Sequence, residues 1–167
     1  MTGEVYFEVK HNAKQPFLVT VNGQVIEDIG TAFDVKAYDD EKQVKTTLVE
    51  GRVKISSGTN NPPVVLHPGQ QADLDINGSL KVVNNVDLEN ILAWKDGITS
   101  FKDADIQTIM REVARWYNVK VAYEGEIPDR LFTGEIMRTS NLSDLLKILE
   151  ESNIRFKIDG NKITVMQ

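Results

Sequence analysis

The chain has 167 residues, a formal net charge of −6 and no cysteine, and its length suits one domain or two small ones. The lack of cysteine excludes a disulfide framework, a CxxC redox pair and thiolate metal sites. The acidic balance and the absence of a concentrated basic cluster argue against nucleic acid as a partner, and no apolar run approaches the ~20 residues that cross a bilayer.

Residues 5–83 show one short strand after another, separated by polar turns. Apolar and polar side chains alternate through Phe17, Val19 and Val21 up to Asn22-Gly23, a pair typical of hairpins because both residues tolerate positive φ. Strands of this length and spacing predict an all-β domain, antiparallel or wound, over residues 1–88.

The alternation is clearest over residues 26–55, where two predicted strands flank a charged turn at 39–42. One face of the first strand carries the odd positions Ile29, Thr31, Phe33, Val35 and Ala37. We expect the even positions, including Asp28, Asp34 and Lys36, to face water. Gly51 interrupts the second strand before Val53 and Ile55, which predicts a β-bulge.

The pattern changes at residues 84–97, and we interpret 89–97 as a linker with Trp94 as an anchor between two domains. After a strand at 98–101 comes a helix whose apolar residues follow i, i+3, i+4, i+7 spacing: Ile106, Ile109, Met110, Val113, Ala114 and Tyr117. Asp103 or Asp105 can cap its first turn, and Asn118 can end it in a left-handed conformation.

Residues 98–167 have the pattern of one β-α-β repeat used twice. A shift of 36 residues carries the helix positions Asp105, Ile109 and Val113 onto Asn141, Leu145 and Leu149. Asn141 begins the second helix, with Asp144 placed as in a capping box. We expect two helices packed against one small sheet, which makes the fold class of the whole chain mainly β plus α+β.

No residue pattern indicates catalysis or metal binding. His11 and His67 lie in predicted turns without a partner acid or nucleophile, so we interpret them as surface residues. Asp73 and Asp75 share a strand face and could bind Ca²⁺ or act as paired acids, but a solvated face is the simpler interpretation. GxSxG, P-loop, GxGxxG and HExxH motifs are absent. We predict a protein that is not an enzyme, with no catalytic residue, no metal site and no cofactor.

Five stretches in order, GEVYFEV (3–9), PFLV (16–19), IGTAFDV (29–35), LVEGRVKI (48–55) and LHPGQQA (66–72), together resemble the FecR protein family. The segment 94–165, with WKDGITSF, RWYNVKV, LFTGEI and NLSDLLKIL, resembles the C-terminal domain that follows FecR in many Gram-negative proteins. That domain is similar to the secretin and TonB short N-terminal fold. The resemblance implies a FecR-type domain at 1–88, a linker at 89–97 and a small α/β domain at 98–167.

The resemblance implies the periplasmic sensor region of a FecR-like anti-sigma factor, anchored to the inner membrane in the full-length protein. Its partners would be the N-terminal signalling domain of a TonB-dependent outer-membrane receptor and, through a cytoplasmic region, an extracytoplasmic-function sigma factor. The sequence departs from the family pattern, because we find no cytoplasmic region, no membrane helix and no strands before residue 3. We therefore expect membrane and sigma-factor contacts only through segments absent from this chain. We also expect an exposed edge near Val5 to Val9, or at the strand that pairs with it, which could promote a homodimer.

We expect the receptor domain to bind the small α/β domain, in part by adding a strand to a sheet edge. The residues chosen for this surface, because one of their two strands could lie at an edge, are Leu131, Phe132, Thr133, Gly134, Ile163, Thr164 and Val165. The alternative function is a periplasmic glycan- or ligand-binding module that senses its ligand through Tyr6, Tyr38 or Trp116. Because Tyr117 continues the apolar stripe of its helix, packing is the simpler role for the Trp116-Tyr117 pair.

Overall fold

The structure is a computed structural model of residues 1–167 and describes all of them except 11, 13, 29, 59–61, 128 and 167. The predictions for His11 and Ile29 therefore lie outside the described residues. The chain divides into two compact units, Met1–Leu88 and Glu89–Gln167, and each has its own hydrophobic core.

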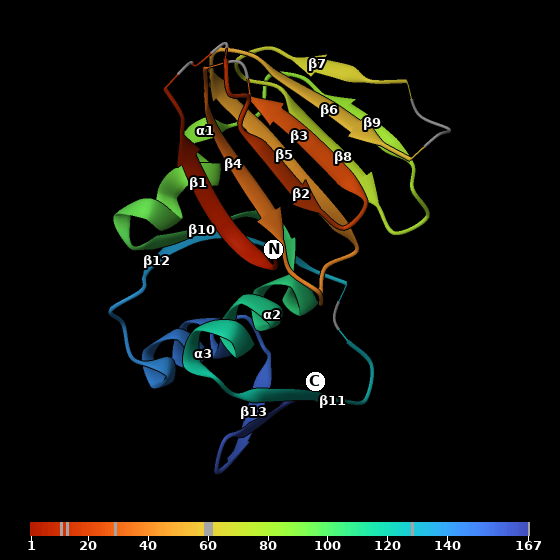
Figure 1. Ribbon diagram of the computed structural model, residues 1–167. Helices are drawn as coiled ribbons and strands as arrows, with labels where there is room; N and C mark the ends of the chain where they lie inside the picture. Colours follow the sequence, from red (N-terminus) through yellow and green to blue (C-terminus); the bar gives the residue numbers. More distant parts are fainter. Residues whose placement is uncertain (11, 13, 29, 59–61, 128, 167) are drawn as a thin grey trace. The chain divides into compact units, whose positions relative to one another are not determined.

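The first unit is a sandwich of two antiparallel sheets, which confirms the predicted all-β class (Figure 1). One sheet has the order β1-β4-β5-β8-β9, with β1 (Gly3–Glu8), β4 (Ala32–Ala37), β5 (Gln43–Glu50), β8 (Gln71–Asp75) and β9 (Leu80–Val83). The other has the order β2-β3-β6-β7, with β2 (Leu18–Val21), β3 (Gln24–Asp28), β6 (Val53–Ser57) and β7 (Val64–Leu66). Inward side chains of both sheets form one core.

The predicted alternation holds for the apolar positions of β4, since Phe33, Val35 and Ala37 are all completely buried. The prediction that Asp28 and Asp34 face water is wrong, because their exposed fractions are 8% and 1%. Asp28 is the last residue of β3, just before the turn that leads to β4. Its carboxylate accepts hydrogen bonds from the Gly30 amide, at 3.1 Å, and from the Thr31 hydroxyl, so the burial of this charge is compensated locally.

The stretch 26–55 does contain the predicted hairpin of β4 and β5, which pair antiparallel. The predicted bulge is not at Gly51, because this residue lies between two strands of different sheets. The register of β4 and β5 shifts just before it, where Ala32 pairs with Glu50 and Phe33 with Leu48. β5 ends at Glu50, and the chain crosses at Gly51 and Arg52 to begin β6 at Val53. The two ends of the stretch meet in the second sheet, where Ile26 of β3 is opposite Ile55 of β6.

The second unit begins with two short helices, α1 (Leu88–Leu92) and the 3-10 helix η1 (Ala93–Asp96), in the segment that we expected to be a linker. The remaining elements are β10 (Ile98–Asp105), α2 (Ile106–Tyr117), β11 (Lys120–Glu124), β12 (Leu131–Met137), α3 (Leu142–Glu150), β13 (Arg155–Asp159) and β14 (Lys162–Met166). Of the helices in the described part of the chain, none combines the length and the apolar character needed to cross a bilayer.

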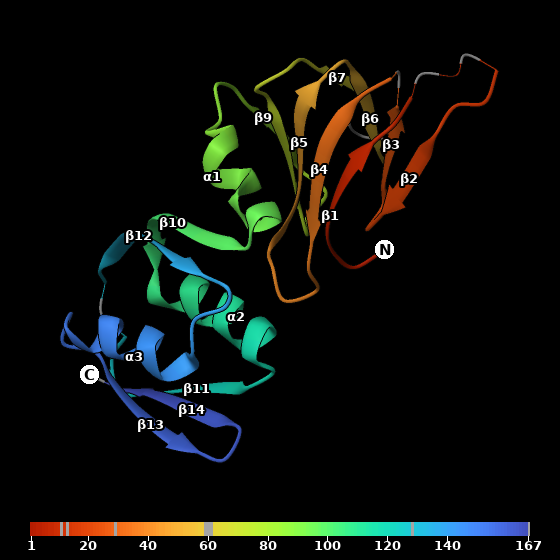
Figure 2. The same ribbon diagram turned by 90° about the vertical axis from the view of Figure 1, so that its left-hand side faces the viewer.

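Helices α2 and α3 form a layer between two small sheets (Figure 2). β10 pairs antiparallel with β12 on one side, and β11-β14-β13 form the other sheet. The predicted β-α-β duplication is confirmed, but the prediction of one sheet is wrong. The two strands of each repeat lie on opposite sides of the helix layer, so β10 pairs with β12 while β11 and β13 flank β14.

The two repeats share their helix geometry. Asp105 caps α2 through its carboxylate, which accepts the Thr108 amide at 2.7 Å, and Asn118 ends the helix with φ +51°. Asn153, the equivalent of Asn118 in the second repeat, has φ +61°. The capping box predicted at Asn141 is not formed, since its side chain makes no capping hydrogen bond. The buried residues of both helices form one core: Ile106, Ile109, Met110, Val113, Leu145, Leu146 and Leu149.

Candidate partner-binding surface

Strand β12 has one unpaired edge among the described residues, because β10 is its only neighbour in the sheet. Such an edge offers main-chain N–H and C=O groups to an added strand. Along β12 the side chains alternate. Phe132 packs against the core of the second unit, whereas Leu131 is 60% exposed and Thr133 faces solvent. Residues 131–134 were chosen because their strand could lie at a sheet edge, and they do lie on an edge strand.

A hollow of about 180 Å³ lies between β12 and α3. Phe132 and Gly134 line it from β12, and Ile148 and Leu149 line it from α3. Leu149 belongs to the core, but Ile148 is 57% exposed. We call this hollow, with the open edge of β12, the β12 groove. It joins apolar side chains to free main-chain groups, which is the combination that an added strand uses.

The other predicted segment, residues 163–165, does not lie at an edge. β14 is the central strand of its sheet, parallel to β11 on one side and antiparallel to β13 on the other, so both of its edges are paired. Ile163 is fully buried and Val165 is 3% exposed, and both belong to the core. Of the two chosen strands, β12 lies at a sheet edge and β14 does not, and the two belong to different sheets. A role of Ile163, Thr164 and Val165 in partner binding stays a prediction.

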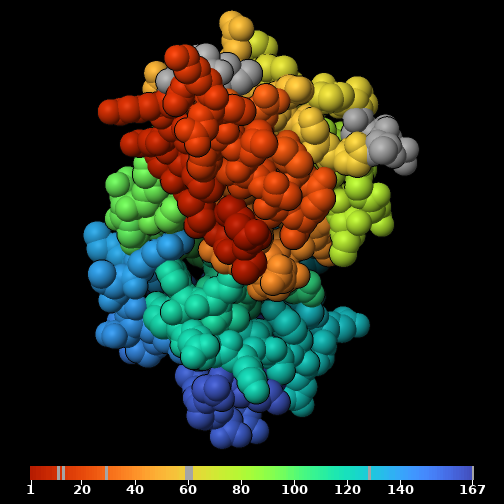
Figure 3. Space-filling view, in the orientation of Figure 1, coloured from red at the N-terminus to blue at the C-terminus, as the bar shows by residue number. Residues whose placement is uncertain are grey.

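The first unit has an open edge at β1, which pairs only with β4 in the described sheet. Its residues, red in Figure 3, lie at the surface, and Val5 is 36% exposed. This is the edge that we expected near Val5. Formation of a homodimer through it stays a prediction.

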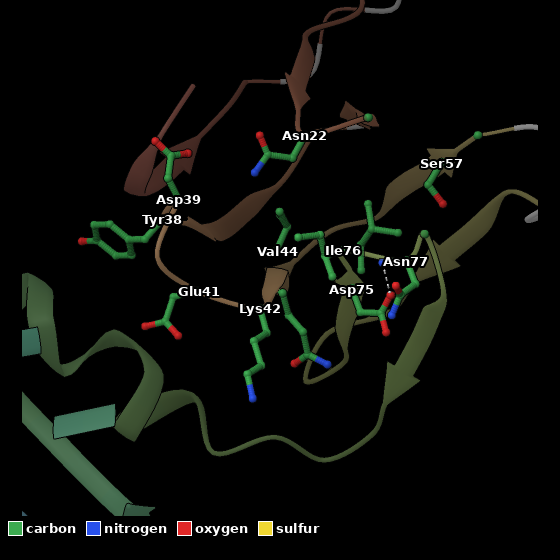
Figure 4. A pocket seen from close by; sticks show the side chains of 15 residues that line it. Asn22, Tyr38, Asp39, Glu41, Lys42, Val44, Ser57, Asp75, Ile76 and Asn77 are labelled. Carbon is green, nitrogen blue, oxygen red and sulfur yellow. Dashed lines mark hydrogen bonds between the residues drawn. The ribbon is translucent and has the colours of Figure 1, made fainter. Parts of the chain in front are cut away.

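A larger hollow, of about 540 Å³, lies among turns at one end of the sandwich in the first unit (Figure 4). Tyr38 and Asp39 line it from the β4–β5 turn, and Asn22 lines it from the β2–β3 turn. Asp75 accepts the Asn77 amide at 2.7 Å, so this carboxylate helps to shape the β8–β9 turn. Of the three aromatic residues considered for ligand sensing, Tyr38 is the one that lines this hollow.

Trp116 packs within the second unit. The guanidinium carbon of Arg138 lies 4.6 Å from the Trp116 ring centre and 6.0 Å from that of Trp94, distances typical of cation–π contacts. Tyr117 donates a hydrogen bond to the Ser140 carbonyl oxygen at 2.7 Å, and burial together with the Asp144 charge raises the pKa of Tyr117. These contacts fit the packing role that the sequence favours.

The carboxylates considered for chemistry are used in local contacts. Asp73 accepts a hydrogen bond from the Gln71 side chain at 2.6 Å, and Asp75 accepts the amides of Asn77 and Ser79. Within the described residues, no group of three or more His, Asp or Glu side chains is arranged to hold a metal ion.

The chain thus has a two-domain fold, an antiparallel sandwich followed by a duplicated β-α-β domain. Two family models match the chain, one in each domain. Residues 1–54 match "FecR protein" and residues 98–165 match "FecR, C-terminal". The chain belongs to the FecR family. No curated protein sequence matches it significantly.

Two similar solved structures are crystal structures of a protein from Parabacteroides distasonis ATCC 8503 that is described as a candidate anti-sigma factor, at 1.65 Å and 2.50 Å resolution. The TM-scores are 0.82 and 0.83 at 23% sequence identity. The similarity covers 98% and 99% of this chain, and 77% and 78% of those chains. At this identity the likeness concerns the fold.

Proposed function

We propose that this chain is the periplasmic sensor region of a FecR-like anti-sigma factor and acts by protein binding without catalysis. In this role the second unit receives the N-terminal signalling domain of a TonB-dependent outer-membrane receptor. The full-length protein, anchored in the inner membrane, then passes the signal to an extracytoplasmic-function sigma factor. Family membership supports the class of protein, and so does the description of the solved structures as an anti-sigma factor.

The observation that carries the binding proposal is the β12 groove. A partner strand beside β12 would pair with its free main-chain groups, and every second side chain would point toward the helix layer. The hollow between Phe132 and Ile148 is the place where one apolar side chain of that strand would be buried. A main-chain edge supplies affinity with little selectivity, whereas a pocket of defined size selects the side chain.

Calorimetric titration with the receptor's signalling domain tests this proposal. Ile148→Asp places a charge at the rim of the groove without disturbing the core, because Ile148 is 57% exposed. We expect the Kd to rise by about tenfold or more. Ile158→Asp is the matched control, since Ile158 is 56% exposed and lies on β13 in the other sheet. Equal Kd values for the two variants would remove the groove from the interface.

A second candidate function rests on the hollow at the end of the sandwich. Its size, about 540 Å³, suits a small molecule, and Tyr38 with the amides of Asn22 and Asn77 supplies groups that commonly contact sugars. In this account the first unit binds a glycan directly. Calorimetric titration with candidate glycans tests this function. Saturable binding that is lost in Tyr38→Ala would favour glycan binding over binding of the receptor's signalling domain.

A further inference from the structure

The outer face of the β11-β14-β13 sheet gathers basic side chains that are scattered along the sequence. Ile163 and Val165 of β14 point into the core, so Lys162, Thr164 and Met166 point to the opposite face. The strand register places six residues beside these three, in the rows Lys120–Lys162–Asp159, Ala122–Thr164–Lys157 and Glu124–Met166–Arg155. We call the surface around Lys120, Arg155, Lys157 and Lys162 the basic sheet face.

This face differs in charge from the chain as a whole. It carries four cations and two carboxylates, whereas the chain has a formal net charge of −6. The two carboxylates, Glu124 and Asp159, lie at opposite corners of the three rows. Among the described residues, none of the four basic side chains forms an ion pair or a hydrogen bond.

Stability gives only part of the reason for this arrangement. Lys162 has Lys120 opposite it on β11, a like charge that opposes strand pairing, and Asp159 opposite it on β13, an opposite charge with which it forms no ion pair. With no partner in the described chain, these cations gain little from the fold itself. Their charge is therefore available to an external anion.

The distribution of charge over the face indicates what kind of partner it fits. A shallow hollow of about 340 Å³ is lined by the small residues Ala122 and Thr164, by Lys157 and Lys162, and by the carboxylates Glu124 and Asp159. The charges of the hollow therefore balance, and the net positive charge of the face comes from Lys120 and Arg155 outside it, so a segment with several carboxylates complements the face as a whole. Across a surface of this kind, complementary charge mainly increases the rate of encounter and fixes orientation.

We propose that the basic sheet face docks a carboxylate-rich segment of a partner protein. This surface lies on the opposite side of the helix layer from the β12 groove, so the two sites can be occupied independently. The inference does not depend on the identity of the receptor.

A glutamate homopolymer peptide, titrated into the whole chain and followed by fluorescence anisotropy, tests the proposal. We expect saturable binding that weakens as salt is added, and a Kd raised by about fivefold or more in the double variant Lys157→Gln with Lys162→Gln. The control double variant is Lys81→Gln with Lys147→Gln, two exposed lysines outside the face, and should bind as the unchanged chain does. Thermal unfolding of each variant checks the fold.

Three results would overturn the proposal. They are the absence of saturable binding to the peptide, an equal loss of affinity in both double variants, and binding to phosphatidylglycerol vesicles without binding to the peptide. Equal receptor Kd values for Ile148→Asp and Ile158→Asp would count against the β12 groove and leave the peptide experiment unaffected, so failure of the proposed function and failure of the docking face can be told apart.

Discussion

Gly51 packs against the backbone of Gly30 so closely that a side chain on residue 51 would collide with the Gly30 carbonyl oxygen, and its Cβ would lie 2.8 Å from the Thr31 methyl carbon. Gly51 also has φ +82°, a conformation that side chains disfavour. The contact holds the crossing between the sheets against the turn that Asp28 stabilises.

Substitution of Gly51 should destabilise the first unit strongly. We expect Gly51→Ala to cost about 2 kcal/mol or more in the free energy of unfolding, and Gly51→Val more, because backbone strain and a steric clash add. Gly23→Ala is the control, since Gly23 has φ +80° but open space around it. It should cost about 1 kcal/mol. Denaturant unfolding measures both, and equal losses would mean that the Gly30 contact is unimportant.

The helix caps of the two repeats should differ in energy although their positions are equivalent. Asp105 accepts the Thr108 amide, whereas the Asn141 side chain makes no capping bond. We expect Asp105→Ala to cost about 1 kcal/mol, and Asn141→Ala to cost less. The thermal unfolding transition of the second unit measures both, and a larger loss for Asn141→Ala would contradict the assigned capping geometry.

Local pattern was sufficient to predict the two long helices of the second unit, α2 and α3. The i, i+3, i+4 spacing of Ile106, Ile109 and Val113 and the left-handed residue Asn118 are properties of neighbouring residues, and the structure has both. The number of sheets is decided by which strands pair across long distances in the sequence. Local alternation carries no information on that pairing, so the prediction of one sheet failed.

Because strand pairing cannot be read from local alternation, the sequence also did not show where the β12 groove and the basic sheet face lie. Leu131 and Ile163 both lie in short strands of alternating pattern, yet β12 has an open edge and β14 is central. Lys120 and Lys162 are far apart in sequence and become neighbours only through the parallel pairing of β11 and β14, so the sequence showed no basic cluster. One local signal of the basic sheet face was present in the sequence. Arg155 and Lys157 alternate with apolar residues and so share one face of a single strand.

Tyr117 should make stability depend on alkaline pH. Burial and Asp144 raise the pKa of Tyr117 above its ordinary value of 10.0, so the folded chain keeps the phenol proton to higher pH than the unfolded chain. This stabilisation is complete below about pH 10 and is lost as the pH rises through the folded-state pKa. Tyr117→Phe should cost about 1 kcal/mol at neutral pH, because the bond to Ser140 is lost. As the pH rises above about 10, the free energy of unfolding of Tyr117→Phe should fall less than that of the unchanged chain, because the variant has no phenol to titrate.

Tyr123→Phe is the matched control for this experiment. Burial is the main cause that raises the pKa of Tyr123, and Arg111 opposes it while Asp105 adds to it. Tyr123 lies on β11 and has no hydrogen bond to a described residue that corresponds to the Tyr117–Ser140 bond. We expect little change at neutral pH in this variant. A neutral-pH loss as large as that of Tyr117→Phe would contradict the role given to the Ser140 contact.

Hydrogen–deuterium exchange with and without the receptor's signalling domain tests the central claim most directly. Strand addition would place the free N–H groups of β12 in hydrogen bonds, so their exchange should slow when the partner binds. The account predicts this protection in Leu131–Met137, with β14 unchanged because its edges are already paired. Binding that leaves exchange in β12 unchanged and protects another strand would contradict it.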